Sequence, residues 1–170
     1  MISDGRVSLR TLTLDDLDAL VDGAGDGRMD APTDRQQLAD QLRSMIEKSP
    51  TLDRDGFVTY GIEVDGELVG DIQARAPKNA TPPGVCELGI TLFPGRRGAG
   101  IGTGAVRLLT DDLIVQGWQR IQAGTAVGNR PMRRVLEKLG FFEEGVMRGF
   151  APGPSGREDY VLYARLATDR

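Results

Sequence analysis

Four glycines alternate in this sequence at Gly98, Gly100, Gly102 and Gly104, directly after an apolar run that is typical of a strand. A helix that begins at this junction leaves its first amide N–H groups unpaired and directs the positive end of its dipole towards the turn, which favours a phosphate group. Glycine lets a phosphate approach the backbone, and it tolerates a positive φ. The segment Arg97 to Thr103 is therefore predicted to hold a pyrophosphate.

Three other interpretations of this segment are a plain tight turn, a dinucleotide-binding fingerprint and a P-loop. Gly100, Gly102 and Ala105 satisfy G-x-G-x-x-G/A, but that fold also needs an acidic residue after the next strand, and residues 120–129 contain no Asp or Glu. The lysine of a P-loop is replaced by Ile101. Four glycines at one strand–helix junction favour phosphate binding over a turn without a ligand.

Histidine is absent, and Cys86 is the only cysteine. These counts argue against a histidine-ligated metal, a multi-cysteine zinc site, an intrachain disulfide and Ser-His or Cys-His nucleophilic catalysis. A covalent acyl-cysteine at Cys86 would lack a histidine partner, and buried free cysteines are mostly inert. We expect no metal and no covalent enzyme intermediate.

The bulk composition is that of an ordinary globular chain. Its 170 residues, 39% hydrophobic and 27% charged, suit one domain spanning residues 1–170. The net charge of -4 and the isoelectric point near 4.9 argue against nucleic acid as a partner. No run approaches the about 18 apolar residues of a membrane helix. The first twenty residues carry four Asp and no apolar signal sequence, so we expect a cytoplasmic protein without a membrane partner.

The elements before the glycines are predicted to run strand, helix, helix, hairpin. The two helices are capped by Thr13 and by Thr33 or Asp34, and Asp65-Gly66 between two apolar runs favours a tight hairpin turn. The predicted ranges are a strand at 7–12, a helix from Leu14 to Gly23 or Gly25, a helix ending before Pro50, hairpin strands at 57–64 and 67–74, and a loop at 76–84.

The elements around and after the glycines alternate between strand and helix. Pro131 suits the first turn of a helix, and Gly117 and Gly140 suit helix ends. The predicted ranges are strands at 86–93 and 120–126, helices from Ile101 to Gly117 and from Pro131 to Gly140, and closing strands at 141–147 and 160–166 around a Gly/Pro-rich loop at 149–156.

Two motifs in this order resemble those of the GNAT acetyltransferases. The run from Glu87 to Thr103 looks like their acetyl-CoA signature R/Q-x-x-G-x-G/A, filled by Arg97, Gly100 and Gly102. The segment Asn129 to Phe141 resembles their second cofactor-side motif. The resemblance covers nearly the full chain and is closest in look to the ribosomal-protein N-terminal acetyltransferases. It implies an α/β (α+β) GNAT fold, with a mixed, mostly antiparallel, splayed sheet of about seven strands and about four helices.

The resemblance also implies where acetyl-CoA, as co-substrate, would bind. The strands at 86–93 and 120–126 would part and admit the pantetheine arm, with backbone groups of Leu92 and Phe93 facing it. Asn129 would contact the cofactor from the far side, although a helix cap explains this residue equally well. The pyrophosphate would be held by Arg97, Gly98, Ala99, Gly100, Ile101, Gly102 and Thr103.

Acyl transfer to an amine needs a neutral amine, a polarised thioester carbonyl and a proton for the departing thiolate. Glu87, beside apolar neighbours, is the candidate general base, directly or through a water; a surface or salt-bridged glutamate is the alternative. Met132 and Leu136 stand where relatives place a serine or a tyrosine, so the general acid has no assigned residue. Tyr160 and Tyr163 could replace it, but aromatic residues in a closing strand usually serve packing.

The acceptor is predicted only as a primary amine. Seven Asp lie between Leu14 and Asp34, which could form an acidic mouth for a cationic amine or simply solvated helix faces and caps. A domain that binds a CoA ester as a sensor or scaffold without turnover is the alternative function. Relatives commonly form paired subunits, so a homodimer is a further expectation from the resemblance.

Overall fold

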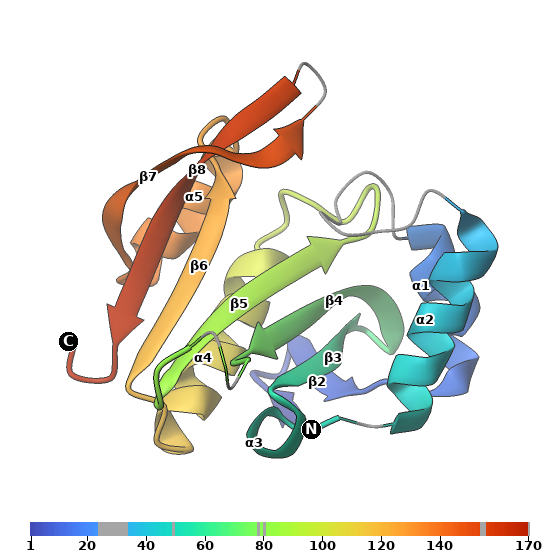
Figure 1. The fold of residues 1–170 in the computed structure, drawn as a ribbon. Coiled ribbons are helices and arrows are strands. Elements are labelled where there is room, and N and C mark those ends of the chain that lie inside the picture. The colour runs from blue at the N-terminus through green and yellow to red at the C-terminus, as the bar shows by residue number, and fades with distance from the viewer. Residues whose placement is uncertain (24–33, 49, 78, 80, 154–155, 170) are drawn as a thin grey trace.

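The computed structural model describes residues 1–23, 34–48, 50–77, 79, 81–153 and 156–169. Its centre is one eight-stranded sheet in the order β1-β2-β3-β4-β5-β6-β8-β7 (Figure 1). Neighbouring strands are antiparallel except β5 and β6, which are parallel. The strands are β1 (Ile2–Ser3), β2 (Val7–Thr11), β3 (Phe57–Val64), β4 (Glu67–Arg75), β5 (Val85–Leu92), β6 (Arg120–Ala126), β7 (Phe142–Gly153) and β8 (Gly156–Leu166).

Helices cover the two faces of the sheet unequally. Buried residues of α4 and α5 pack with those of the sheet into one large core, whereas α1 and α2 form a second, smaller core with Leu12, Leu68 and Phe93 on the opposite face. The helices are a short 3-10 turn η1 (Leu14–Asp16), α1 (Leu17–Gly23), α2 (Arg35–Lys48), the single turn α3 (Leu52–Asp55), α4 (Ile101–Val115) and α5 (Arg130–Lys138). None of the described helices is long and apolar enough to cross a membrane.

Most predicted elements are present with shifts of one or two residues at their ends. The Asp65-Gly66 turn joins β3 to β4, and both residues have positive φ, 52° and 79°, as a type I′ turn requires. Asp34 accepts a hydrogen bond from the Gln37 amide at 2.9 Å at the start of α2. Gly23 is the last residue of α1, while Gly25 and Thr33 lie outside the described residues.

The closing hairpin differs from the prediction. The segment predicted as a loop at 149–156 belongs mainly to β7 and β8, which pair at Ala151 with Glu158 and at Gly153 with Gly156. Arg157 on β8 donates to the carbonyl groups of Gly149 and Phe150, and these bonds across the hairpin hold that part of β7 beside β8. The strand β1 and the turn α3 were not predicted, because elements of two and four residues show no periodicity.

The sheet opens between its two parallel strands. Among the described residues, pairing between β5 and β6 is confined to Val85–Glu87 against residues 120–122. Beyond these pairs the strands part towards their carboxyl ends (Figure 1). We call this separation, between residues 88–92 and 123–126, the splay. The predicted opening of the sheet is confirmed.

Candidate functional site

The turn before α4 has the backbone shape that phosphate binding needs. Gly98 and Gly100 have φ of 84° and 79°, and Gly100 is the N-cap of α4 without a side-chain acceptor for the helix amides. A Cβ built on Gly98 would meet no atom within 4 Å, and one on Gly100 would have only the Arg6 Nη1 at 3.8 Å. The residues 97–103, which we call the cradle, therefore join an exposed turn at 97–100 to the first amides of α4, which a helix leaves unpaired, and this arrangement fits a phosphate group.

The last two alternating glycines serve the packing of the helix. Gly102 and Gly104 lie inside α4. A Cβ on Gly104 would come within 3.0 Å of the Val7 Cγ2, and one on Gly102 would lie 3.6 Å from the Leu92 Cδ1. The missing side chain of Gly104 therefore lets α4 approach β2 closely, whereas a Cβ on Gly102 would make an ordinary contact with β5. Of the four alternating glycines, Gly98 and Gly100 thus have positive φ in the turn, and Gly102 and Gly104 face neighbouring strands from within α4.

The arginines near the cradle differ in their partners. Arg97 is exposed, whereas Arg96 is ion-paired with Glu67 on β4. Arg6, from the turn between β1 and β2, donates from Nη2 to the Ala99 carbonyl at 2.7 Å. Sequence motifs did not identify Arg6, because 93 residues separate it from Ala99.

The backbone of β5 faces the splay at alternate residues. The Phe93 amide donates to the Val69 carbonyl on β4 at 2.9 Å, and the Phe93 carbonyl accepts from the Arg96 amide at 3.0 Å. Leu92 pairs with Gly70, so the alternation of an antiparallel ladder turns the N–H and C=O of Leu92 away from β4 and towards the splay. The same holds for Ile90. The backbone groups of Leu92 therefore face the splay, whereas those of Phe93 are hydrogen-bonded to Val69 and Arg96.

Asn129 caps α5. Its Oδ1 accepts from the Met132 amide at 3.3 Å, and Pro131 lies in the first turn as predicted. Asn129 is therefore a helix cap, one of the two roles expected for it. The residue is also exposed to solvent, in the loop after β6.

Glu87 lies where the two parallel strands separate. It pairs with Gln122 on β6 in the last described β5–β6 pair, and its own strand neighbours Cys86 and Leu88 are buried in the core under α4. Alternation therefore puts its side chain on the opposite face of the sheet, the face of α1 and α2. The side chain is 38% exposed, and its carboxylate accepts a hydrogen bond from the Arg75 Nη2 at 3.2 Å. Glu87 is thus salt-bridged, as the alternative interpretation expected, and it is also accessible to solvent.

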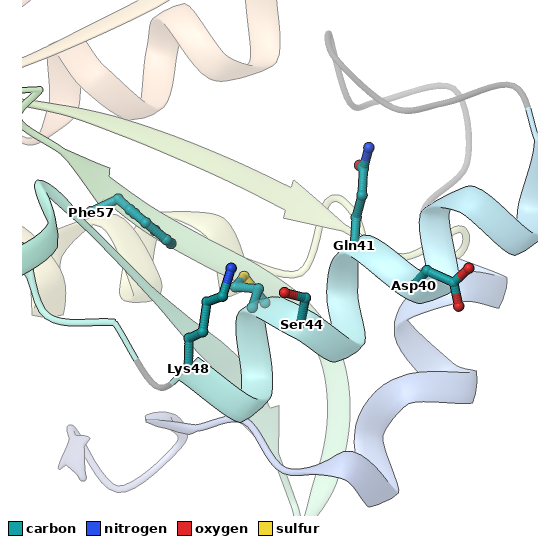
Figure 2. A pocket seen from close by; sticks show the side chains of 6 residues that line it. Asp40, Gln41, Ser44, Lys48 and Phe57 are labelled. Atoms are coloured by element: carbon teal, nitrogen blue, oxygen red, sulfur yellow. The ribbon is translucent and has the colours of Figure 1, made fainter.

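A shallow pocket that is widely open to solvent lies beside α2 on this same face. It has a volume of about 460 Å³ and is lined by Asp40, Gln41, Ser44, Met45, Lys48 and Phe57. In Figure 2 the Phe57 ring reaches from β3 towards α2, with Ser44 and Lys48 on the helix side. Phe57 is in register with Arg75, and Arg75 with Glu87, so these three side chains share one face. Two strand spacings separate Phe57 from Glu87, which is about 10 Å.

Met132 and Leu136 of α5 supply no hydroxyl group to the splay. Leu136 is fully buried in the core and Met132 packs against it. The Tyr163 hydroxyl, also buried, donates to Glu137 Oε1 at 3.0 Å and accepts from the Arg133 Nε at 3.1 Å. Burial raises the pKa of Tyr163 above its ordinary value. The hydroxyl also lies 3.2 Å from Glu143 Oε2 on β7, so its hydrogen bonds join α5, β7 and β8 and fit a structural role.

Tyr160 lies on the other face of β8. A Cβ on Gly124 of β6 would lie 3.8 Å from the Tyr160 ring, which also contacts the Phe150 ring at 5.3 Å between centroids. Burial raises the pKa of Tyr160. Burial likewise raises the pKa of the Cys86 thiol to about 12, which keeps this thiol protonated and unreactive at neutral pH.

Three of the seven aspartates in the first helical region have structural partners. Asp16 binds the Arg10 guanidinium through both carboxylate oxygens at 2.8 Å, Asp22 pairs with Arg35, and Asp34 caps α2. These contacts favour the cap and helix-face interpretation over an acidic mouth. Asp26 and Asp30 lie outside the described residues.

Comparison with known proteins gives one consistent result. The sequence profile described as acetyltransferase (GNAT) domain matches residues 6–142. A probable N-acetyltransferase of Bacillus subtilis (strain 168), YjcK, is 31% identical over 133 residues, covering 76% of this chain and 72% of that protein.

Solved structures share the fold over nearly the whole chain. Mycobacterium smegmatis RimJ in complex with CoA-disulfide superposes with a TM-score of 0.79 at 25% identity, covering 95% of this chain and 82% of that one. The ribosomal L7/L12 α-N-protein acetyltransferase RimL in complex with coenzyme A has a TM-score of 0.79 at 20% identity, covering 98% and 96%.

Proposed function

The chain belongs to the GNAT family of acetyltransferases, and from this premise we propose that it transfers an acetyl group from acetyl-CoA to a primary amine by direct attack in a ternary complex. The observation that carries the proposal is the cradle at the start of α4 beside a splay whose β5 edge presents unpaired backbone groups. A ligand with a phosphate group at one end and an amide-containing arm would satisfy both features at once.

The cofactor would be held by three parts of the chain. The backbone of residues 97–103 would bind the pyrophosphate, with Arg97 supplying charge at the opening of the turn. Leu92 and Ile90 would hydrogen-bond the arm through the backbone groups that β6 leaves unpaired. Asn129, which already caps α5, would border the far side of the splay. Bound there, acetyl-CoA supplies the thioester that the amine attacks.

Glu87 would take the proton from the amine, directly or through a water. Its carboxylate is solvent-accessible, lies at the base of the splay and is oriented by Arg75, so it can accept a proton on the face opposite α4. The acceptor would approach from this face, since the other is filled by α4 and α5. The pocket at Phe57 and α2 supports an acceptor that extends about 10 Å beyond its amine.

A non-catalytic acyl-CoA sensor is the second candidate function. It is favoured by one observation, the burial of Leu136 and the packing of Met132 into the core, which removes two positions from the protonation of a leaving thiolate. Both functions require acetyl-CoA binding, and they differ only in turnover.

Two measurements test the proposal. Titration calorimetry with acetyl-CoA is expected to show binding, and heat absent for the wild-type protein would overturn both candidates. A thiol-release assay across a panel of peptide, amino-acid and polyamine amines is expected to show turnover that needs both substrates. Tight acetyl-CoA binding without turnover on any amine would select the sensor.

A further inference from the structure

Arg6 reaches the cradle from a distant part of the sequence. It lies in the turn between β1 and β2, and its Nη2 donates to the Ala99 carbonyl at 2.7 Å. Its Nη1 lies 3.8 Å from the point that a Cβ on Gly100 would occupy. The guanidinium is therefore at the rim of the cradle, next to the N-cap of α4.

The turn that carries Arg6 is fixed to α4. Asp4 accepts from the amides of Arg6 and Val7 at 3.0 and 2.8 Å, and its second oxygen accepts from Arg107 on α4. The amides of Val7 and Arg6, and then the Arg107 charge, lower the pKa of Asp4, so that it stays a carboxylate at neutral pH. Because Val7 also packs against Gly104, the backbone of Arg6 has little freedom to move away from the helix.

Arg6 differs from the neighbouring arginines in having no ion-pair partner among the described residues. In the described part of the chain no carboxylate lies within ion-pair distance of its guanidinium, whereas the nearby Arg96 and Arg107 pair with Glu67 and Asp4. One of its five N–H donors is used by a neutral carbonyl, and the rest of the exposed fork faces the solvent beside the cradle. A fork of this kind suits a phosphate, which accepts two parallel hydrogen bonds from it.

We propose that Arg6 is a phosphate-binding residue of the cradle and contacts the pyrophosphate of CoA together with the amides of α4. The inference rests on the proposed function, since it names a further residue of the same cofactor site. Arg6 both holds the Ala99 carbonyl, which keeps the turn in its binding shape, and adds a positive charge beside Gly100 at the start of α4. The pyrophosphate is favoured over the 3′-phosphate because Arg6 lies at residues 99–100, in the turn itself.

Calorimetry with CoA and with 3′-dephospho-CoA tests this assignment. Arg6→Gln keeps an N–H donor for Ala99 but removes the charge, and it is expected to weaken both ligands by the same factor, about tenfold. Arg6→Lys keeps the charge and is expected to lose less. The matched control Arg43→Gln removes an equal charge from an exposed position on α2 and is expected to bind both ligands as the wild type does.

The loss in Arg6→Gln is also expected to shrink as the salt concentration rises, because a charge contact is screened and a purely structural effect is not. Unchanged affinity in both Arg6 variants would overturn the proposal, and so would a loss confined to CoA, which would place Arg6 at the 3′-phosphate. A wild-type protein that binds neither ligand would instead overturn the proposed function itself. Arg6 is exposed, so the thermal midpoints of the variants are expected to match the wild type and to confirm folding.

Discussion

At the scale of single residues, the position of Glu87 depends on its neighbours on both sides. Arg75 on β4 fixes the carboxylate from one side, and the end of the β5–β6 pairing leaves the other side open. A surface ion pair of this kind contributes little to stability, about 1 kcal/mol or less. The pair therefore matters for the orientation of the carboxylate more than for the fold.

Glu87→Gln is expected to lower kcat/KM about 100-fold or more, because general base catalysis by a positioned carboxylate contributes at least this factor. Acetyl-CoA affinity should stay at the wild-type value, since the base faces the acceptor. Steady-state kinetics and calorimetry measure the two effects separately.

Glu144→Gln is the matched control for this variant. Glu144 is likewise a strand glutamate paired with an arginine, Arg120, but it lies on the edge strand β7. Its kcat/KM is expected to change less than about twofold, as for other exposed ion pairs. An equal loss in both variants, or none in Glu87→Gln, would remove Glu87 from the role of base.

At the scale of elements, the turn before α4 and the turn η1 before α1 each depend on one local device. The first uses positive-φ glycines, and the second uses Arg10, which binds Asp16 and Glu63 and so attaches η1 to β2 and β3. A single substitution can remove either the positive-φ glycine or the Arg10 ion pair, and each is expected to affect the whole turn that depends on it.

Gly100→Ala is expected to weaken acetyl-CoA binding at least about tenfold, because the new Cβ lies in the cradle where a phosphate would approach. It also forces alanine to a φ of 79°, which costs about 1 to 2 kcal/mol. Gly66→Ala is the matched control, since Gly66 has the same φ of 79° and equally open surroundings in the β3–β4 turn. Equal stability loss with a binding defect only in Gly100→Ala is the expected result; a shared binding defect would contradict the cradle.

Asp16→Asn is expected to lower the free energy of unfolding at pH 7 by about 2 kcal/mol, the contribution of hydrogen bonds to a charged group. The hydrogen bonds from Arg10 lower the pKa of Asp16 below its ordinary 3.8. A depressed folded-state pKa gives stability that is complete well above 3.8 and is lost as the pH falls through the folded-state pKa. Urea unfolding should therefore show the penalty shrinking below about pH 4.

The neighbouring Asp15→Asn is the control for this pH series. Asp15 is exposed, and its substitution is expected to change stability by less than about 0.5 kcal/mol at every pH. A penalty for Asp16→Asn that stays constant into the acid range would show that the ionised pair is not its source.

At the scale of the whole molecule, the splay divides the sheet into two parts that remain joined in two ways. Three residue pairs connect β5 to β6, and the core under α4 and α5 runs continuously beneath both parts. A core shared in this way favours a single unfolding unit, in spite of the interruption in the sheet.

We therefore expect residues 1–170 to unfold in one transition, with coincident curves from far-ultraviolet circular dichroism and from the fluorescence of the single tryptophan, Trp118. Acetyl-CoA at about 100 times its Kd should add about 2.7 kcal/mol and raise the midpoint by about 5 to 10 °C. Separate transitions by the two probes would mean that the parts on either side of the splay unfold independently.

The sequence by itself determined the features that depend on a few consecutive residues. The β3–β4 hairpin follows from Asp65-Gly66, the capping of α5 from Asn129, and the cradle from the glycines before α4. Each is a property of local backbone conformation, which the residue type restricts directly. The order of the elements follows from the same local patterns, whereas the parting of the strands at 86–93 and 120–126 was expected only from the resemblance to the GNAT family.

Only the tertiary structure decided which distant residues meet. It brought Arg6 to Ala99, paired Arg75 with Glu87 and fixed the face of β5 on which Glu87 lies. It also extended β7 to Gly153 and began β8 at Gly156, within a segment that local propensity assigns to a loop. Such contacts depend on strand register and helix packing across the whole chain, and local sequence patterns carry no information on either.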